Sequence, residues 1–356
     1  MRIPLIVVSR PRLFVRLLSV VALLASVTAL ASRTGVRAAS TSEGIPRLKH
    51  VFVIVLENED FDASWGPASP AKYLNSLVPH GTFATHYYGV SHLSADNYIA
   101  MTSGQSPAPT FNADCINWSS CYLTEKARLD GGRNIGDQLD EAGQSWAAWM
   151  GGMKAPCQHP ALTDPSDPDQ KGYATRHDPF VYYPTLVDDQ PRCEAHVRPY
   201  QQLTPMLAKG GPDVPAFNFI VPDTCDDGHD APCADGRPGG LVSADAWLKA
   251  NVPLILNSPA YKDRGALFIT FDEASNSDMS GCCVTGYSRM GLDGGGLIGL
   301  LMLSPLGRAG HATDAYYSHF SLLRTVEDAF GINEHLNSAY ADKVSPMAEL
   351  FSKEGS

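Results

Sequence analysis

The sequence predicts an α/β domain built on a mostly parallel sheet, and two observations lead to this prediction. A continuous apolar run, as expected of a strand buried on both faces, covers Val51–Leu56, and mainly apolar runs at Phe217–Val221 and Ala266–Phe271 predict two more strands. Segments with helical character alternate with these runs along the chain. A chain that alternates strands and helices in this way is typical of parallel sheets.

The elements are expected in a definite order between these runs. Helices are predicted at Ala71–Leu77, from Ser94 to Met101, and at Ile135–Ala142, Ser243–Leu256 and Ser318–Phe330, and further strands at Trp146–Met150 and Leu297–Leu303. Gly104 and Gly331 are expected to end the helices that they follow. Residues 151–199, rich in Pro, Asp and Tyr, are predicted to form a loop held by disulfides.

The first forty residues indicate export. Arg10, Arg12 and Arg16 precede an apolar run at Leu17–Ala31, and small residues follow it. This pattern predicts a signal peptide at residues 1–39, a single mature domain at 40–356, and a secreted or periplasmic location. The alternative is a membrane anchor, but the run falls short of the roughly 20 residues that span a bilayer. No later segment is apolar enough to span, so no transmembrane segment is expected after cleavage.

The charge of the mature chain excludes some partners. Residues 1–39 hold six Arg and no acidic residue, which leaves 21 basic and 38 acidic residues, a net charge of −17. A surface of this charge repels nucleic acid, so no nucleic-acid partner is expected. A phosphate-ester substrate would need a local cation to offset the same repulsion.

Eight cysteines in an exported chain predict disulfides rather than a zinc cage. Cys115 with Cys121, Cys225 with Cys233, and Cys157 with Cys193 are candidate pairs. Cys282 and Cys283 are adjacent, and they could pair with each other or with different partners. The connectivity stays open at this point.

Acidic side chains follow three of the predicted strands. Glu57, Asn58, Glu59 and Asp60 follow the first; Asp223, Asp226, Asp227, His229 and Asp230 follow the run ending at Val221; Asp272 and Glu273 follow the run ending at Phe271. Active sites of open parallel sheets collect beyond the carboxyl ends of strands. Carboxylates that converge there repel one another unless a cation lies among them. Oxygen ligands favour calcium, magnesium or manganese, and the nearby histidines keep iron and zinc open.

A nucleophile is predicted at the same edge. Ser94, in the run His92-Leu93-Ser94-Ala95-Asp96-Asn97-Tyr98, stands where a helix begins. Helix N-terminal amides can hold an anion, and a metal could acidify the hydroxyl of Ser94. Asn97 and His92 are candidate donors to phosphate oxygens. The alternative is that Ser94 only caps the helix.

The motifs resemble one family when they are taken in order. Glu57-Asn58, His92-x-Ser94-x-x-Asn97-Tyr98, Asp227-Gly228-His229-Asp230, Phe271-Asp272-Glu273 and the run from Ser318-His319 to Glu327 fall between about His50 and Gly331. The series resembles the phosphoesterase family of bacterial secreted acid phosphatases and phospholipases C, a branch of the alkaline phosphatase superfamily. The short secreted acid phosphatases look most similar. This resemblance implies a three-layer α/β/α sandwich.

The resemblance also implies roles for individual residues. Glu57, Asn58, Asp272, Glu273 and Ser94 would hold a divalent metal ion, with Ser94 as the nucleophile. His92, His229 and His319 would bind phosphoryl oxygens or protonate the leaving group, and Asp227 would orient a histidine or join the metal shell. This chain departs from the family pattern at Leu93 and Asp96, where proline is usual, and at Asp223 and Asp226, where asparagine is common. Asp96 is expected to add negative charge near the phosphate.

The sequence therefore predicts a secreted, metal-dependent hydrolase of phosphoric ester bonds, most simply an acid phosphatase that forms a phosphoserine. Its substrate would be a small phosphate ester, with a phospholipid or phosphoinositide headgroup included in that class. A phospholipase C or another phosphodiesterase is the alternative among enzymes. A non-catalytic exported metal- or phosphate-binding protein is the alternative of another class. The sequence gives neither the natural substrate, the identity of the metal nor the oligomeric state.

Overall fold

The computed structural model describes residues 43–105, 107, 114–115, 118, 121–122, 132–159, 172–209, 213–284, 294–340 and 342–352. The predicted signal peptide at residues 1–39 lies outside these ranges. Within them, no helix has both the length and the apolar character needed to cross a membrane.

The described residues form one eight-stranded sheet in the order β4-β3-β5-β1-β6-β7-β2-β8. Its strands are β1 (His50–Leu56), β2 (Thr82–Tyr88), β3 (Trp146–Met150), β4 (Val197–Pro199), β5 (Phe217–Val221), β6 (Gly265–Phe271), β7 (Leu300–Leu303) and β8 (His311–Ser318). Strand β7 runs antiparallel to both of its neighbours, and every other pairing is parallel. The predicted mostly parallel sheet is confirmed.

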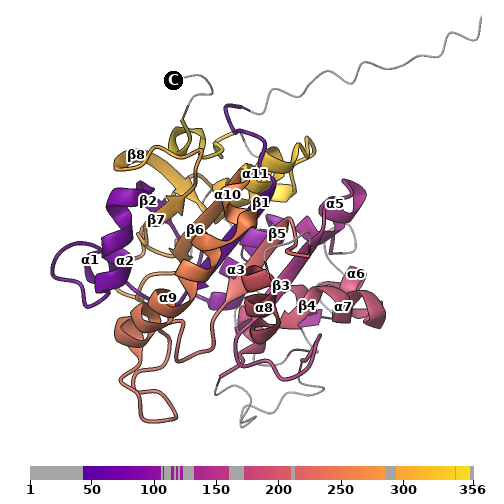
Figure 1. Ribbon diagram of the computed structural model, residues 1–356, viewed down its shortest axis with the longest axis horizontal. Helices are drawn as coiled ribbons and strands as arrows, with labels where there is room; N and C mark the ends of the chain where they lie inside the picture. The colour runs from indigo at the N-terminus through magenta and orange to yellow at the C-terminus, as the bar shows by residue number, and fades with distance from the viewer. Residues whose placement is uncertain are drawn as a thin grey trace, which may run out of the picture. The chain divides into compact units, whose positions relative to one another are not determined.

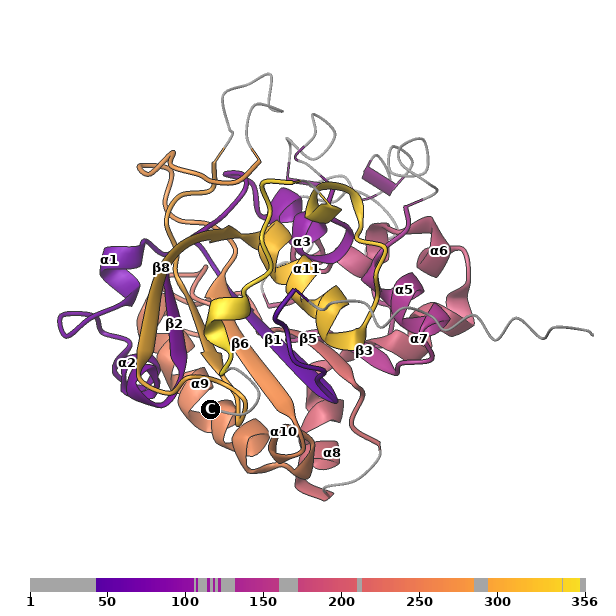
Figure 2. The same ribbon diagram turned by 90° about the horizontal axis from the view of Figure 1, so that it is seen from above.

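Helices cover both faces of this sheet (Figures 1 and 2). On one face, α9 (Gly240–Asn257) packs against α2 (Lys72–Leu77), α8 (Leu203–Lys209) and α10 (Pro259–Lys262). On the other face, α11 (His319–Phe330) packs against α3 (Ser94–Ser103) and α5 (Ile135–Glu141). The short helix α1 (Phe61–Ser64) follows β1. The expected three-layer α/β/α sandwich is the observed architecture.

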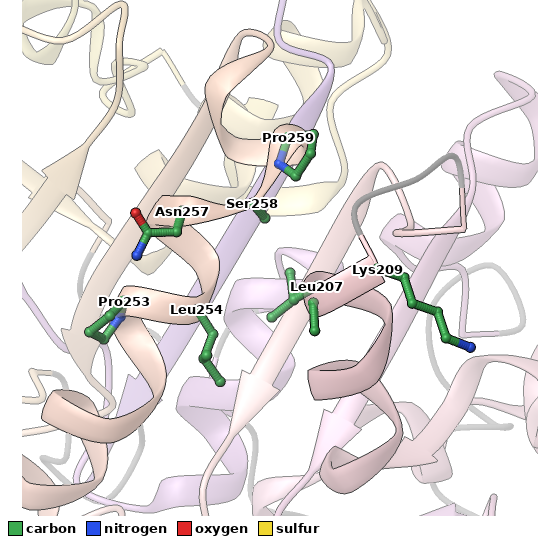
Figure 3. A pocket seen from close by; sticks show the side chains of 8 residues that line it. Leu207, Lys209, Pro253, Leu254, Asn257, Ser258 and Pro259 are labelled. Carbon is green, nitrogen blue, oxygen red and sulfur yellow. The ribbon is translucent and has the colours of Figure 1, made fainter.

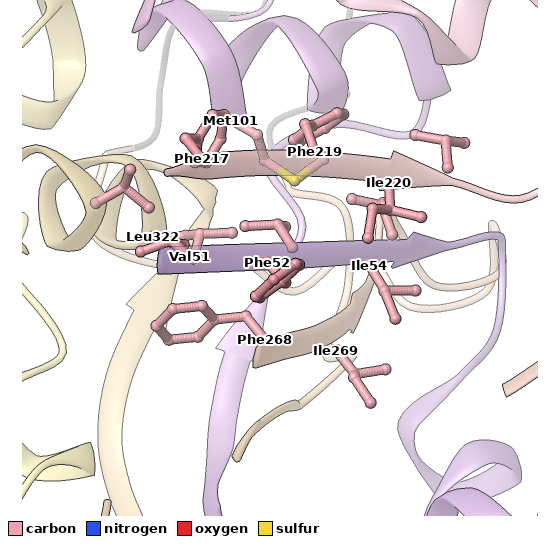
Figure 4. Close-up of a cluster of buried hydrophobic side chains, with 14 of the residues drawn as sticks. Val51, Phe52, Ile54, Met101, Phe217, Phe219, Ile220, Phe268, Ile269 and Leu322 are labelled. Atoms are coloured by element: carbon pink, nitrogen blue, oxygen red, sulfur yellow. The ribbon is translucent and has the colours of Figure 1, made fainter. Parts of the chain in front are cut away.

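Strand β1 lies at the centre of the core, between β5 and β6 (Figure 4). Phe52 and Ile54 are fully buried, as a strand covered on both faces requires. Met101 of α3 lies beside Phe217 and Phe219 of β5 and belongs to the same hydrophobic cluster. Each buried side chain of this size stabilises the fold by about 1.5–3 kcal/mol relative to exposure. This packing fixes α3 against the sheet, and α3 begins with Ser94.

The described part of residues 151–199 is not the irregular loop that the sequence predicted, although the Cys157–Cys193 disulfide does hold it. The described part contains the 3₁₀ helices η4 (Thr175–His177) and η5 (Pro179–Tyr182), the helices α6 (Pro184–Val187) and α7 (Gln190–His196), and strand β4. These elements are too short to show a period of 3.6 or 2 in the sequence. Their ends are set by local chemistry, because the Asp189 side chain accepts the Arg192 N–H at the start of α7.

Two other expectations for the sheet need correction. The strand predicted at Leu297–Leu303 begins only at Leu300, and Gly299 before it has a φ of +72°, which does not continue a strand. Strand β8 was not predicted. It is an edge strand whose residues are only partly buried, so its sequence shows no continuous apolar run.

Four disulfides link the cysteines. They join Cys115 to Cys121, Cys157 to Cys193, Cys225 to Cys233, and Cys282 to Cys283. The first three are the candidate pairs of the sequence. For the adjacent cysteines, the structure contains the bond between the two neighbours.

Candidate active site

Backbone hydrogen bonds bring three acidic strand ends together. Asp272 N donates to Leu56 O at 2.9 Å, and Glu57 N donates to Asp227 O at 2.9 Å. The end of β2 approaches the same point, because a Cβ atom at Gly89 would lie 2.9 Å from Asp272 O. Only glycine allows that approach. The residues after β1, β2, β5 and β6 therefore share one edge of the sheet, as the sequence predicted for its acidic clusters.

Four carboxylates are buried at this edge: Glu57, Asp227, Asp272 and Glu273. Three of their oxygens, Asp227 Oδ2, Asp272 Oδ2 and Glu273 Oε2, are buried and have no hydrogen-bond partner. A buried carboxylate oxygen without a donor is costly. A bound cation would supply the missing partner.

The pKa values of these carboxyl groups follow from their burial. Burial raises the pKa of Glu57 well above its ordinary value, and the charges of Asp272 and Asp227 raise it further. Burial raises the pKa of Asp272 to about 7. Burial and then the charge of Asp272 raise the pKa of Glu273. A divalent cation would reverse these shifts, so the donor set fits a hard metal ion.

Ser94 lies among these carboxylates. Its Oγ donates to Glu57 Oε2 at 3.2 Å, and the residue is 4% exposed. Ser94 is the first residue of α3, and the cap position belongs to Leu93, whose side chain makes no capping hydrogen bond. The predicted N-cap role is therefore wrong, because the hydroxyl points to Glu57 and not to the helix amides.

Asn58 contributes to the site through its backbone. Its N–H donates to Asp272 Oδ1 at 3.1 Å, and its φ of 55° turns the chain sharply after β1. The expected metal ligands Glu57, Asp272, Glu273 and Ser94 lie within one cluster, and Asn58 adjoins it.

His92 has one ring nitrogen directed at the carboxylates. Its Nε2 lies 2.7 Å from Asp278 O, and since a carbonyl only accepts, Nε2 carries a hydrogen. Its Nδ1 lies 3.3 Å from Glu273 Oε2. The imidazole therefore faces Glu273 without a hydrogen bond between these two atoms.

Asn97 and His319 use their donors within the protein. Asn97 Nδ2 donates to Ser91 O at 2.8 Å and to Leu93 O at 3.1 Å, so both amide hydrogens are used within the turn. His319 is fully buried; its Nε2 donates to Asp272 O at 2.5 Å, and its Nδ1 lies 2.9 Å from Tyr87 OH. In this structure Asn97 shapes the turn before Ser94, and His319 positions Asp272.

His229 and Asp227 are close neighbours, but they do not bond through their side chains. Asp227 Oδ1 accepts the His229 backbone N–H at 2.8 Å. His229 Nδ1 pairs with Asp230 Oδ1 at 2.9 Å, and its Nε2 accepts from Arg176 Nη2 at 3.0 Å. Arg176 also pairs through Nε with Asp114 Oδ2 at 2.9 Å. Sequence reasoning missed this arginine, although a basic residue in an acidic segment was a usable signal.

His177 is the other residue that the sequence analysis missed. It is buried in η4, and its Nδ1 lies 3.5 Å from Glu57 Oε1 and 3.3 Å from Asp227 Oδ2. Burial, and then the neighbouring Arg176 and His229, hold the pKa of His177 well below its ordinary value. Glu57, His177 and Asp227 could together hold a metal ion.

The described residues also line a cavity of about 340 Å³ elsewhere in the fold (Figure 3). It lies between the ends of α8 and α9, where the chain leads into β5 and β6 rather than out of them. Leu207, Pro253 and Leu254 line it with Lys209, and no carboxylate or histidine does. The cavity lacks the groups that phosphate chemistry requires.

The sequence and the fold were compared with those of known proteins. The model of the Phosphoesterase family matches residues 67–333. A probable acid phosphatase of Kluyveromyces lactis is 25% identical over 78% of this chain, and the chain spans only 57% of that relative. A phosphatidylinositol-3-phosphatase of Mycobacterium tuberculosis is 24% identical over 94% of both chains.

A solved structure shares the fold. The structure of a protein in the alkaline phosphatase superfamily from Vibrio parahaemolyticus has a TM-score of 0.51 and 14% identity, over 82% of this chain and 69% of that one. At this identity the likeness concerns the fold alone. It agrees with the mostly parallel sheet between two helical layers.

Proposed function

The chain belongs to the Phosphoesterase family, and from this premise we propose that it is an exported, metal-dependent phosphatase that hydrolyses phosphate monoesters with Ser94 as nucleophile. The family confirms the resemblance found in the sequence, and it agrees with the predicted class of a hydrolase of phosphoric ester bonds. The predicted signal peptide and the four disulfides support a secreted or periplasmic location.

One observation carries the proposal. A serine hydroxyl stands 3.2 Å from Glu57 Oε2 inside a cluster of four buried carboxylates, three of which have an unpaired oxygen. Ser103 of the same helix differs, because its hydroxyl donates to the backbone at Ile99 O. The position of Ser94 is that of a nucleophile beside a cation site.

Glu57, Asn58, Asp272, Glu273 and Ser94 are the residues proposed to hold a divalent ion. When bound, the ion would lower the pKa of the serine hydroxyl and offset the charge of the phosphate. The nearby positive side chain, Arg176, already pairs with Asp114 and so does little to neutralise this cluster. This makes the proposed enzyme dependent on metal.

The protein's own groups then account for the proton and the phosphoryl transfer. Ser94 Oγ attacks phosphorus in line while its proton passes to Glu57 Oε2, its observed acceptor. The bond from phosphorus to the leaving oxygen breaks, and a phosphoserine forms. His92, whose Nδ1 faces Glu273, is placed to share the proton that the leaving alkoxide takes up. Water then attacks the phosphoserine from the side that the leaving group vacated.

The substrate class follows from the relatives' names and remains part of the proposal. The names acid phosphatase and phosphatidylinositol-3-phosphatase favour a small phosphomonoester, with a phosphoinositide headgroup included in that class. A phospholipase C or other phosphodiesterase is the alternative for the same centre. A binding protein without turnover is the alternative of another class.

Turnover of p-nitrophenyl phosphate and of p-nitrophenyl phosphorylcholine separates these three functions. Ser94→Ala tests the nucleophile, and Ser103→Ala is the matched control because Ser103 is buried on the same helix but bonds to helix backbone. Ser94→Ala should lower kcat by about 10⁴-fold or more, and acid quenching of the wild type should trap phosphoserine at position 94. The control should keep its kcat. Retention of most of the kcat by Ser94→Ala would return Ser94 to a structural role.

A further inference from the structure

We propose that Glu327, Gln138 and residues 336–338 form a clasp controlled by one proton: protonated Glu327 holds residues 336–338 against the C-terminal end of α3, and its ionisation releases them. Helix α3 begins with Ser94, so Glu327 is also a positioning residue for the reaction at the other end of this helix. This second statement rests on the proposed function, whereas the clasp itself does not. Glu327 closes the motif that begins at Ser318, and the proposed reaction uses no atom of it.

Residues 336–338 close the end of α3. Ser338 N donates to Gly104 O at 2.9 Å, and Asn337 Nδ2 donates to Ser103 O at 2.8 Å. The last carbonyl groups of a helix have no partner within the helix, so these two donors complete it. The two segments also touch, because a Cβ atom at Gly104 would lie only 2.3 Å from Leu336 O. Displacement of residues 336–338 therefore leaves two carbonyl groups at the end of α3 without these donors.

One oxygen of Glu327 holds this segment. Glu327 is fully buried on α11, and its Oε1 accepts the Leu336 N–H at 2.9 Å. Its Oε2 is also buried, and it has no hydrogen-bond partner in the part of the chain that the structure describes. The side chain of Gln138 on α5 interacts with this carboxyl group. Gln138 donates through Nε2 to Glu334 O, and its buried Oε1 likewise lacks a partner among the described residues.

One proton satisfies both of these oxygens. Two acceptors cannot bond to each other, and each costs free energy while it is buried without a donor. A protonated Glu327 has an O–H group that Gln138 Oε1 can accept, while Glu327 Oε1 keeps the Leu336 N–H. Ionisation removes that donor and places a negative charge in the core. The clasp is therefore stable with the proton and destabilised without it.

The surrounding charged groups do little to compensate an ionised Glu327. Burial raises the pKa of Glu327 well above its ordinary value; the Leu336 N–H and the Gln138 side chain oppose this rise by less, and Asp328 raises the pKa further while Arg324 lowers it. The charged side chains of the elements packed here have partners of their own: Arg324 pairs with Glu43, Asp328 with His335, Arg133 with Glu141 and Glu334, and Arg192 with Asp137 and Asp140. A proton is thus the simplest means of neutralising Glu327.

The pH dependence of the clasp has a definite sign. Glu327 in the released segment is exposed to water and takes its ordinary pKa of 4.5, whereas the clasped group has a higher pKa. The clasped form therefore binds the proton more tightly, and the stability that this binding contributes is complete below pH 4.5 and is lost as the pH rises towards the pKa of the clasped group. Between these two values the equilibrium constant for release rises about tenfold per pH unit.

Amide hydrogen exchange of the full chain measures this release. After correction for the intrinsic exchange rate, the opening constants of the Leu336 and Ser338 N–H groups should rise about tenfold per pH unit above pH 5 in the wild type. Glu327→Gln copies the protonated form, because its amide oxygen can accept the Leu336 N–H while its NH₂ group donates to Gln138 Oε1. Its opening constants should not change with pH.

Glu141→Gln is the matched control. Glu141 also lies on α5, but it is exposed and pairs with Arg133, so this variant should follow the wild type. Opening constants that do not depend on pH in the wild type, or that rise equally in Glu327→Gln, would overturn the clasp.

The proton can also be observed without any variant. The ¹³C resonance of the Glu327 carboxyl carbon, assigned through the bonds of the residue, should have the chemical shift of a neutral acid in the folded wild type at pH 7. The chemical shift of a carboxylate at that pH would overturn the proposal even if Glu327→Gln failed to fold.

Activity tests the positioning role separately from the clasp. With the same divalent ion present, the kcat of Glu327→Gln relative to that of the wild type should rise between pH 6 and pH 10, by up to about tenfold per pH unit. A ratio that stays constant would overturn the link to Ser94. If neither protein hydrolyses a phosphate ester, the proposed function fails, and hydrogen exchange with the carboxyl resonance still decides whether the clasp exists.

Discussion

Replacing Asp272 by Asn should stabilise the metal-free protein at pH 8 while it weakens the hold on the proposed cation. Asp272 Oδ1 accepts the N–H groups of Asn58 and Glu273, and the amide oxygen of Asn can accept both. The new NH₂ group takes the place of Oδ2, which has no partner now. The variant therefore keeps the local hydrogen bonds and loses a buried charge.

The size of the effect follows from the pKa of Asp272. Burial raises that pKa from 3.8 to about 7, a difference worth on the order of 4 kcal/mol. Because the folded-state pKa is above the unfolded-state value, the folded protein binds the proton more tightly. The free energy of unfolding of the metal-free wild type therefore falls as the pH rises from about 4 to 7, and stays low above it. The carboxyl groups around Asp272 titrate together with it, so the full value of about 4 kcal/mol need not belong to Asp272 alone. The free energy of unfolding of the variant should therefore be higher by about 2–4 kcal/mol at pH 8.

Chemical denaturation of metal-free protein at pH 4.5 and pH 8 measures this gain. The free energy of unfolding of Asp272→Asn should exceed that of the wild type at pH 8 and nearly equal it at pH 4.5. Asp263→Asn serves as the control, because Asp263 is an exposed partner of Lys49 and should change little at either pH. A difference between Asp272→Asn and wild type that does not depend on pH, or that is destabilising at pH 8, would refute the reasoning about a buried, uncompensated charge.

Two further predictions concern the metal and the disulfides. A strong chelator should abolish turnover and one divalent ion should restore it; calorimetry should also show tighter metal binding at pH 7 than at pH 5, because protons compete for Asp272. Full activity in metal-free protein, or an affinity independent of pH, would contradict this. Replacing Cys157 and Cys193 by Ala should cost about 4 kcal/mol, against about 2 kcal/mol for Cys115 and Cys121, since the first bond spans a sequence separation of 36 and the second a separation of 6. Denaturation curves showing equal losses would argue against the loop-entropy explanation.

The acidic strand ends could be predicted from the sequence because the signal is local. Val51–Leu56 is apolar throughout and Ala266–Phe271 is apolar except for Thr270, and each is followed at once by carboxylates. Parallel pairing of Leu56 with Phe271 then places Glu57 beside Asp272 without further information. The proposed nucleophile Ser94 was predicted in the same way, from its place at a helix start after a strand.

The histidine that faces Glu57 could not be predicted in this way. His177 lies in a short 3₁₀ helix, far along the chain from both Glu57 and Asp227, and only tertiary packing brings the three together. The hydrogen bonds that Asn97 and His319 make within the protein could not be predicted for a related reason. The motifs identify the residue types, but not which acceptor each side chain meets. In the structure the carbonyl of Leu93 accepts from Asn97 and the carbonyl of Asp272 accepts from His319.

The reversed direction of β7 has a consequence for the range of substrates. Strand β6 ends at the site, and β7 starts there, so the chain between Phe271 and Leu300 leaves and returns at one edge. An antiparallel pair needs only a two-residue turn, whereas a parallel pair needs a crossover of a dozen or more. The sheet therefore sets no minimum length, beyond a tight turn, for the segment between β6 and β7. Evolution can lengthen, shorten or exchange this segment beside the proposed catalytic groups while the strands that carry them stay as they are. Asp278, which lies in this segment and accepts from His92, is an example of a contact that it supplies.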